Sequence, residues 1–157
     1  MGIYEHGYDD ILTEVQRRFG FTPEIFNSGG NIMIFETRLD DGSFLWITDA
    51  DCDVTPRPRR LAKEADGHYV GWQVSIYPPE AGAPPLDLSA ADTVGSTAPA
   101  VPEVDSCTRL ASVTHHTAPA EQLPDLIELA LRGRRRHEHH QFALDGTHTV
   151  RLGIDHY

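Results

Sequence analysis

Long apolar stretches are missing from this sequence. No segment approaches the roughly 18–20 consecutive apolar residues that a transmembrane helix requires. The first residues, Met-Gly-Ile-Tyr-Glu-His, also lack the basic segment and the apolar core of an export signal. We therefore expect a cytoplasmic protein that does not bind a membrane.

Cysteine is scarce, because Cys52 and Cys107 are the only two. In a reducing compartment such thiols are usually small buried side chains, and not a disulfide or a catalytic group. A chain of 157 residues can bury a core without a disulfide or a metal to hold it together. We expect residues 1–157 to form a single domain.

Basic residues are outnumbered by acidic ones. The chain has 13 Lys and Arg against 24 Asp and Glu, a formal net charge of −11. A general nucleic-acid binder neutralises phosphates with clustered cations, so this composition excludes that class. A basic protein partner remains open. A DNA-mimic decoy is a second possibility for an acidic chain, and it would need its carboxylates spaced along one extended face.

Two strand-like runs, at 31–39 and 43–49, flank Asp41-Gly42 at the centre of the fold. Both runs are rich in β-branched and aromatic residues, which suit a pleated, half-buried surface. Asp-Gly between such runs is a strong hairpin signal, because glycine adopts positive φ freely and aspartate tolerates it. The sequence therefore predicts a central β-hairpin.

Two segments carry apolar residues at the three- and four-residue spacing of an amphipathic helix. The first spans about 8–19, with Asp9 and Asp10 near its start and Gly20 as its stop. The second begins at about 121 and runs into the 130s, ending at Gly133 or continuing into the arginines that follow. Its apolar positions are Leu123, Leu126, Ile127, Ala130 and Leu131.

Further strands are predicted at 24–27, 68–77 and 108–115, and Asp145-Gly146 predicts a closing hairpin. The strand at 68–77 should bury one face, formed by Val70, Trp72, Val74 and Ile76. The prolines and arginines of 54–67 indicate an exposed loop with one helical turn at 60–65. The class is α+β: a largely antiparallel sheet of about five to seven strands, packed by two amphipathic helices, with a long Pro-rich loop.

The Pro-rich loop spans residues 78–106, where Pro, Ala, Gly, Ser and Thr dominate the composition. Its prolines remove backbone donors, so the segment cannot extend a regular strand. We interpret it as a surface loop or linker. Its sparse apolar residues Leu86, Leu88 and Val94 are candidate contacts for a partner.

Residues 8–78 follow the order helix, short strand, Ser-Gly-Gly-Asn, strand, Asp-Asp-Gly, strand and Gly-Trp-Gln-Val-Ser-Ile-Tyr. In this order the segment resembles uncharacterised small α+β proteins found in actinobacteria and their phages. The resemblance implies a small accessory protein, encoded by a phage or another mobile element. It assigns no functional residue.

Asp49, Asp51 and Asp53 are the first candidate metal ligands. They alternate, so a continuing strand would place all three on one face as oxygen ligands for Ca²⁺ or Mg²⁺. The spacing begins like an EF-hand loop, but Val54 stands where that loop requires glycine. A solvated acidic strand end is the alternative interpretation.

His137, His139 and His140 are the second candidate set. If the second helix continues through residue 140, His137 and His140 share a face, and three histidines could hold Zn²⁺ as metallohydrolases do. The pattern is not His-Glu-x-x-His, because Gln141 stands where the second histidine is required. Surface histidines without a metal are the alternative interpretation.

Arg134, Arg135 and Arg136 form the one strongly basic run, which suits a helix C-terminus and is also a candidate contact for an anion or a partner. No Gly-x-Ser-x-Gly nucleophile motif occurs. We therefore predict a non-enzymatic acidic module that binds or inhibits a protein partner, or pairs with a second copy, without a cofactor. The alternatives are a metal-dependent hydrolase, which would combine the histidines with the three aspartates, and a DNA-mimic decoy.

Overall fold

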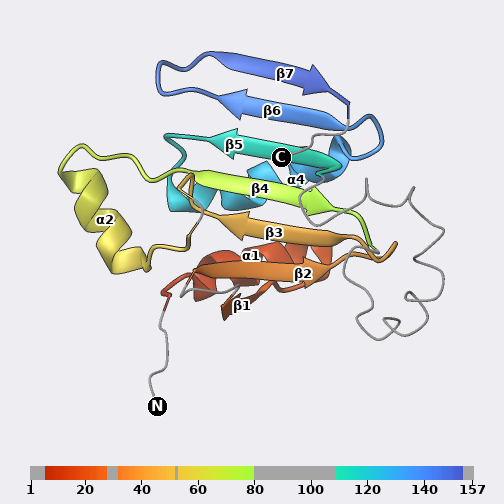
Figure 1. Ribbon diagram of the computed structural model, residues 1–157. Coiled ribbons are helices and arrows are strands. Elements are labelled where there is room, and N and C mark those ends of the chain that lie inside the picture. The colour runs from red at the N-terminus through yellow and green to blue at the C-terminus, as the bar shows by residue number, and fades with distance from the viewer. Residues whose placement is uncertain (1–5, 28–31, 52, 80–108, 154–157) are drawn as a thin grey trace, which may run out of the picture.

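The computed structural model describes residues 6–27, 32–51, 53–79 and 109–153. Within these ranges, seven strands form one open sheet in chain order (Figure 1). Their bounds are β1 Glu24–Asn27, β2 Met33–Arg38, β3 Phe44–Thr48, β4 Trp72–Tyr77, β5 Ala111–His115, β6 Glu138–Phe142 and β7 His148–Leu152. Neighbouring strands are antiparallel, except that β5 and β6 are parallel. The predicted α+β class with a largely antiparallel sheet is confirmed.

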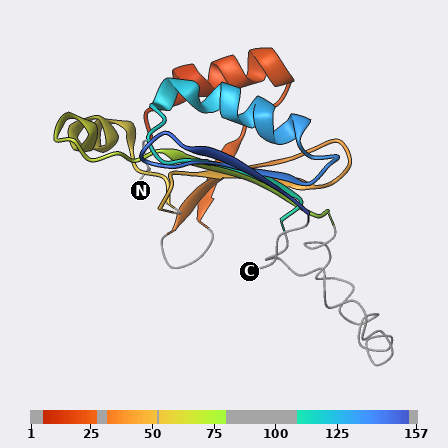
Figure 2. The same cartoon turned by 90° about the horizontal axis from the view of Figure 1, so that it is seen from above.

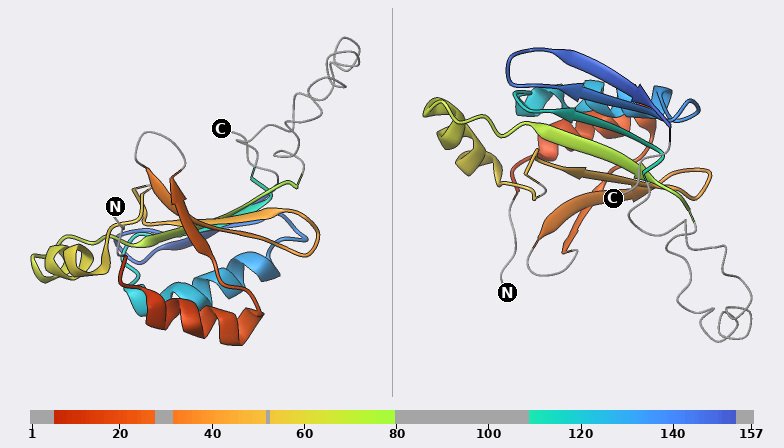
Figure 3. Two further views of the ribbon diagram at one scale, coloured as in Figure 1. Left: turned by 90° about the horizontal axis from the view of Figure 1, so that it is seen from below. Right: turned by 45° about the horizontal axis from the view of Figure 1, so that its top comes forward.

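Two helices cover one face of this sheet, and a third lies beside it. The first two are α1, Asp9–Phe19, and α4, Leu123–Arg132, which directly follows the 3-10 turn η4, Ala120–Gln122. They lie next to each other on the same face, whereas α2, Arg57–Ala65, lies beyond the ends of the strands (Figures 2 and 3). The crossover between the parallel strands β5 and β6 is made by α4, because a short turn cannot join parallel strands. We call the covered side of the sheet the helix face and the opposite side the second face.

The local sequence explains why α1 forms and where it packs. Its buried residues are Ile11, Leu12 and Val15. Gly20 ends the helix in the left-handed conformation, with a φ of 84°, which glycine adopts without strain. Arg18, in the last turn, contacts Asp125 and Glu128 at 2.9 and 2.5 Å, and these ion pairs join α1 to α4.

The hydrophobic core lies between the helix face and the two helices that cover it. The sheet contributes Phe35, Leu45, Ile47, Trp72, Val74, Ile76 and Val113. The buried residues of α4 include Leu123, Leu126, Ile127 and Ala130. The predicted buried face of residues 68–77 is confirmed, because Val70, Trp72, Val74 and Ile76 are all buried.

The expectation of an exposed loop over residues 54–67 is wrong, because residues 57–65 form the helix α2. Pro56 is the N-cap of this helix and Pro58 lies in its first turn, where the backbone N–H has no helical partner to lose. Proline therefore begins a helix here instead of marking a loop. Arg60, which the loop interpretation placed in solvent, is fully buried.

Most of the Pro-rich segment lies outside the described residues. This holds for Leu86, Leu88 and Val94, and also for Cys52 and Cys107. None of the helices in the described part of the chain combines the length and the apolar character needed to cross a membrane.

Candidate functional site

The three aspartates that follow β3 lie in a turn and not on a strand. The strand ends at Thr48, and the Asp49 carboxylate then accepts the N–H groups of Asp51 and Asp53 at 3.0 and 3.1 Å. Its second oxygen accepts the Thr55 hydroxyl at 2.6 Å. The metal-ligand hypothesis required a strand that continues through Asp53, and this condition is not met, because the Asp49 side chain bonds nearby backbone donors in place of a strand ladder.

Burial makes Asp49 sensitive to pH. Asp49 is only 2% exposed, and this burial raises the pKa of its carboxyl above the ordinary value of 3.8. The hydrogen bonds from Thr55, Asp53 and Asp51 act in the opposite direction, because they stabilise the charged form. A raised pKa means that the folded protein binds this proton more readily than the unfolded chain. The stability that this group contributes is therefore complete below about pH 4 and is lost as the pH rises through the folded-state pKa.

We expect Asp49→Asn to abolish the loss of stability that Asp49 causes as the pH rises. Asparagine keeps an oxygen for the backbone N–H groups, and its amide can donate to the Thr55 hydroxyl, but it carries no charge. The free energy of unfolding of the variant should rise relative to that of the wild type as the pH goes from about 4 to about 7. Urea unfolding at several pH values measures this difference. The exposed carboxylate of Asp51 provides the matched control, Asp51→Asn, and a pH-independent difference for Asp49→Asn would contradict the assignment.

The three predicted zinc ligands lie in different places. His137 precedes β6 with a φ of 55°, and its Nδ1 is 3.0 Å from the Leu110 carbonyl. His139 and His140 are consecutive in β6 and therefore lie on opposite faces of the sheet. The predicted three-histidine face needed a helix through residue 140, but α4 ends at Arg132. Among the described residues, no group of three or more His, Cys, Asp or Glu side chains is placed to hold a metal ion.

Both ring nitrogens of His139 bond to other groups of the chain. Its Nε2 lies 2.7 Å from the Gly153 carbonyl, which can only accept, so this nitrogen carries the hydrogen. Nδ1 then accepts the Ser112 hydroxyl at 2.8 Å. Because His139 and Ser112 are only 4% and 3% exposed, we interpret this contact as a structural link between β5 and β6 on the second face.

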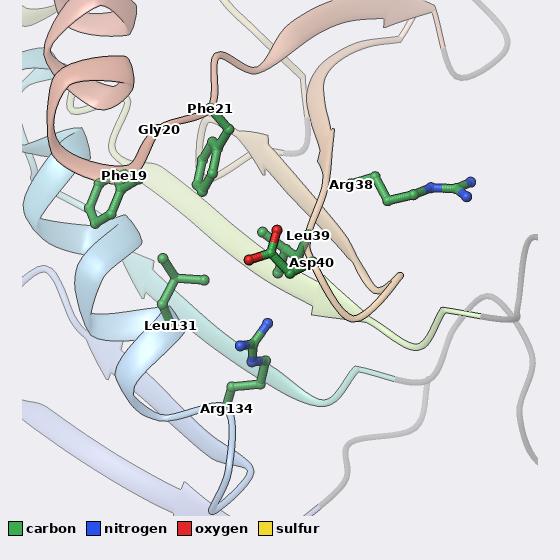
Figure 4. A pocket seen from close by; sticks show the side chains of 8 residues that line it. All are labelled: Phe19, Gly20, Phe21, Arg38, Leu39, Asp40, Leu131 and Arg134. Carbon is green, nitrogen blue, oxygen red and sulfur yellow. The ribbon is translucent and has the colours of Figure 1, made fainter.

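Arg134 lines a pocket of about 260 Å³ (Figure 4). The lining residues are Phe19, Gly20, Phe21, Arg38, Leu39, Asp40, Leu131 and Arg134. Arg134 and Asp40 point toward the pocket, whereas Arg38 points away from it (Figure 4). The pocket therefore has an apolar wall with one cationic and one anionic group.

The predicted arginine run lies in the turn between α4 and β6, and carboxylates of the same chain lie near it. Arg134 is 3.6 Å from Asp41, and Arg136 is 3.6 Å from Glu138. Arg135 is exposed. The positive charge that the run presents to a partner is therefore partly offset within the molecule.

Arg60 is the buried polar residue that sequence reasoning missed. Its guanidinium carbon lies 4.2 Å from the centroid of the Trp72 ring. Nη2 donates to the carbonyls of Gly71 and Ala118 at 2.9 and 2.8 Å, and Nε contacts Glu64 at 3.2 Å. These contacts tie α2 to the start of β4 and to the loop after β5. No local pattern separates Arg60 from the exposed basic residues around it.

At the outer edge of the sheet, β7 is exposed along its whole length (Figures 1 and 3). Val150 and Leu152 are 49% and 56% exposed. In the register, Val150 lies opposite His140, which lies opposite the buried Val113, so these apolar side chains project from the helix face. The other edge strand, β1, has only four residues. We call His148–Leu152 the β7 edge.

Of the features formed by the described residues, the β7 edge is the one best suited to contact another macromolecule. It combines an outward-facing strand with exposed apolar side chains at alternate positions. A scan for a matching protein family, a search of curated proteins and a search of solved structures found no match for this chain.

Proposed function

We propose that this chain is a non-enzymatic accessory module that binds a protein partner by accepting an extended strand at the β7 edge. The observation that carries the proposal is the exposure of all five residues of β7 at the end of an open sheet. An edge strand presents a row of backbone N–H and C=O groups to another chain. Addition of a strand to such an edge is a common mode of peptide recognition.

The side chains of the edge define the chemistry of the partner strand. Val150 and Leu152 project from one face, with Arg151 between them directed to the other. A partner strand should therefore carry apolar residues at alternate positions, where they cover Val150 and Leu152. Each such cross-strand pair contributes roughly 0.2–1 kcal/mol.

Charge indicates that the strand comes from a basic protein and not from a second copy. The net charge of −11 attracts cationic partners and increases their association rate, whereas two copies repel each other. We therefore favour a heterologous partner over the homodimer. The relationship to accessory proteins of actinobacteria and their phages remains part of the proposal.

The geometry favours neither of the two alternative functions. A metal-dependent hydrolase needs converging ligands, and the described residues contain no such group of three. A DNA mimic needs free carboxylates along one face, but those of Asp10 and Glu121 contact Arg57, at 2.6 and 2.9 Å. These two carboxylates therefore join α1 and the turn η4 to α2.

Affinity capture with an edge variant tests the proposal. The wild type and the double variant Val150→Lys/Leu152→Lys are immobilised, and captured proteins from a cell extract are quantified by mass spectrometry. We expect the double variant to retain about tenfold less of a saturable partner, because lysine removes the apolar contacts and adds repulsion toward a basic strand. Binding is then repeated with that purified partner, and amide NMR shifts should change in β7.

Leu61→Lys is the matched control, because Leu61 is 52% exposed on α2, away from the edge. This variant should capture the partner as well as the wild type does. Equal capture by the edge variant, or NMR shifts confined to other strands, would contradict binding at the β7 edge.

A further inference from the structure

Two imidazoles meet on the helix face of the β6–β7 hairpin. Nδ1 of His140 lies 3.0 Å from Nε2 of His148. Their ring centroids are 5.2 Å apart and their planes differ by 24°. Because the centroids are much farther apart than the two nitrogens, the rings meet edge to edge through these atoms. Each nitrogen is therefore directed at the other.

Neighbouring side chains hold both rings in this arrangement. The Glu138 carboxylate lies 3.0 Å from Nε2 of His140 and accepts its hydrogen, which leaves Nδ1 with a free electron pair. The His148 ring stacks on Phe142 with centroids 4.0 Å apart, and Phe142 stacks on His115 at 4.6 Å. The two nitrogens are therefore held close together, and a tilt of each ring is enough to direct both at one third atom.

We propose that His140 and His148 bind a divalent cation of the Zn²⁺ class between these two nitrogens. At tetrahedral Zn²⁺, with Zn–N bonds of about 2.0–2.1 Å, two imidazole nitrogens lie about 3.3 Å apart, so the observed 3.0 Å separation must open slightly. Each ring must also tilt by roughly 35° to direct its nitrogen at the ion. The cation replaces the shared hydrogen, and His148 then carries its proton on Nδ1. Binding therefore requires no net loss of a proton from the neutral pair.

Glu138 gives this pair the second shell of a metal site. A carboxylate that accepts the other N–H of a ligating histidine orients the ring and raises its basicity. The chain supplies two ligands, and water fills the remaining positions. Imidazole nitrogen favours Zn²⁺, Ni²⁺ and Cu²⁺, whereas Mg²⁺ and Ca²⁺ favour oxygen. This site is independent of strand addition at the β7 edge, and it differs from the predicted set of His137, His139 and His140.

Titration of the untagged full chain with ZnCl₂ at neutral pH, followed by calorimetry, tests the site. We expect one Zn²⁺ per chain, no response to MgCl₂, and loss of the binding event in His148→Gln, whose exposed position tolerates the change. Glu138→Gln should weaken Zn²⁺ binding by about ten- to hundredfold. His68→Gln, which alters an exposed histidine outside the hairpin, is the matched control and should bind as the wild type does.

NMR of the imidazole groups distinguishes this site from adventitious binding to the other histidines. Zn²⁺ should shift the ring signals of His140 and His148 together, and the amide spectrum of His148→Gln should show that the fold is retained. An unchanged isotherm in His148→Gln, or shifts confined to other histidines, would overturn the assignment. So would the absence of any Zn²⁺ binding.

Discussion

Arg60→Ala is expected to lower the free energy of unfolding by about 3 kcal/mol or more. The change removes the donor to the carbonyls of Gly71 and Ala118 in a region without solvent access. Each buried acceptor left without a donor costs roughly 1–3 kcal/mol. The loss of the guanidinium from the Trp72 ring also leaves a cavity. Urea unfolding monitored by circular dichroism measures the total.

Two variants separate this role of Arg60 from a general effect of charge. Arg59→Ala removes an exposed guanidinium one residue earlier and should change stability by about 0.5 kcal/mol or less. Arg60→Lys keeps the charge but lacks the planar group that donates to two carbonyls, so an intermediate loss is expected. If the free energy of unfolding of Arg60→Ala lies within about 1 kcal/mol of the wild-type value, the contacts of Arg60 with β4 and the loop after β5 contribute little to the fold.

Gly71→Ala is expected to have an effect of similar size, about 3 kcal/mol, through the backbone. Gly71 has a φ of 69°, and an added Cβ would lie 2.3 Å from the His115 carbonyl oxygen and 2.8 Å from the His116 carbonyl carbon. Both are backbone atoms at the end of β5, so no side chain can move to make room. The start of β4 must shift away from β5, which also displaces the carbonyl that Arg60 contacts.

Gly67→Ala is the matched control for the substitution at Gly71. Its φ is 87°, also in the left-handed region, but nothing lies within 4 Å of the added Cβ. The free energy of unfolding of this variant should fall by only about 1 kcal/mol, the cost of holding alanine at positive φ. The difference between the two melting curves then reports the close approach of β4 and β5. Equal losses would contradict that explanation.

Local patterns predicted most of the secondary structure. The Asp41-Gly42 turn lies between β2 and β3 and the Asp145-Gly146 turn between β6 and β7, as expected from glycine at positive φ. The apolar spacing likewise predicted α1 and α4. These predictions hold because the periods of 2 and 3.6 residues follow from backbone geometry alone. Proline is ambiguous by the same local criteria, and so only one turn of α2, at 60–65, was predicted.

The arrangement of the histidines was less predictable, because it depends on which strands become neighbours. His139 and His140 are adjacent in sequence, yet their side chains contact different strands. His139 bonds Ser112 of β5, whereas His140 contacts His148 of β7. The carboxylate of Asp49 was expected to face solvent or a metal, but local backbone donors surround it.

The acidic charge, the α+β class and the buried faces of strands and helices follow from composition and periodicity, which can be read from the chain without knowledge of its contacts. The burial of Arg60, the contact of His140 with His148 and the exposure of Val150 and Leu152 at an edge depend instead on how the elements pack. The apolar alternation of β7 is the same as that of a buried strand. Its exposure follows from its place as the last strand of an open sheet, where no further element of the described chain pairs with it.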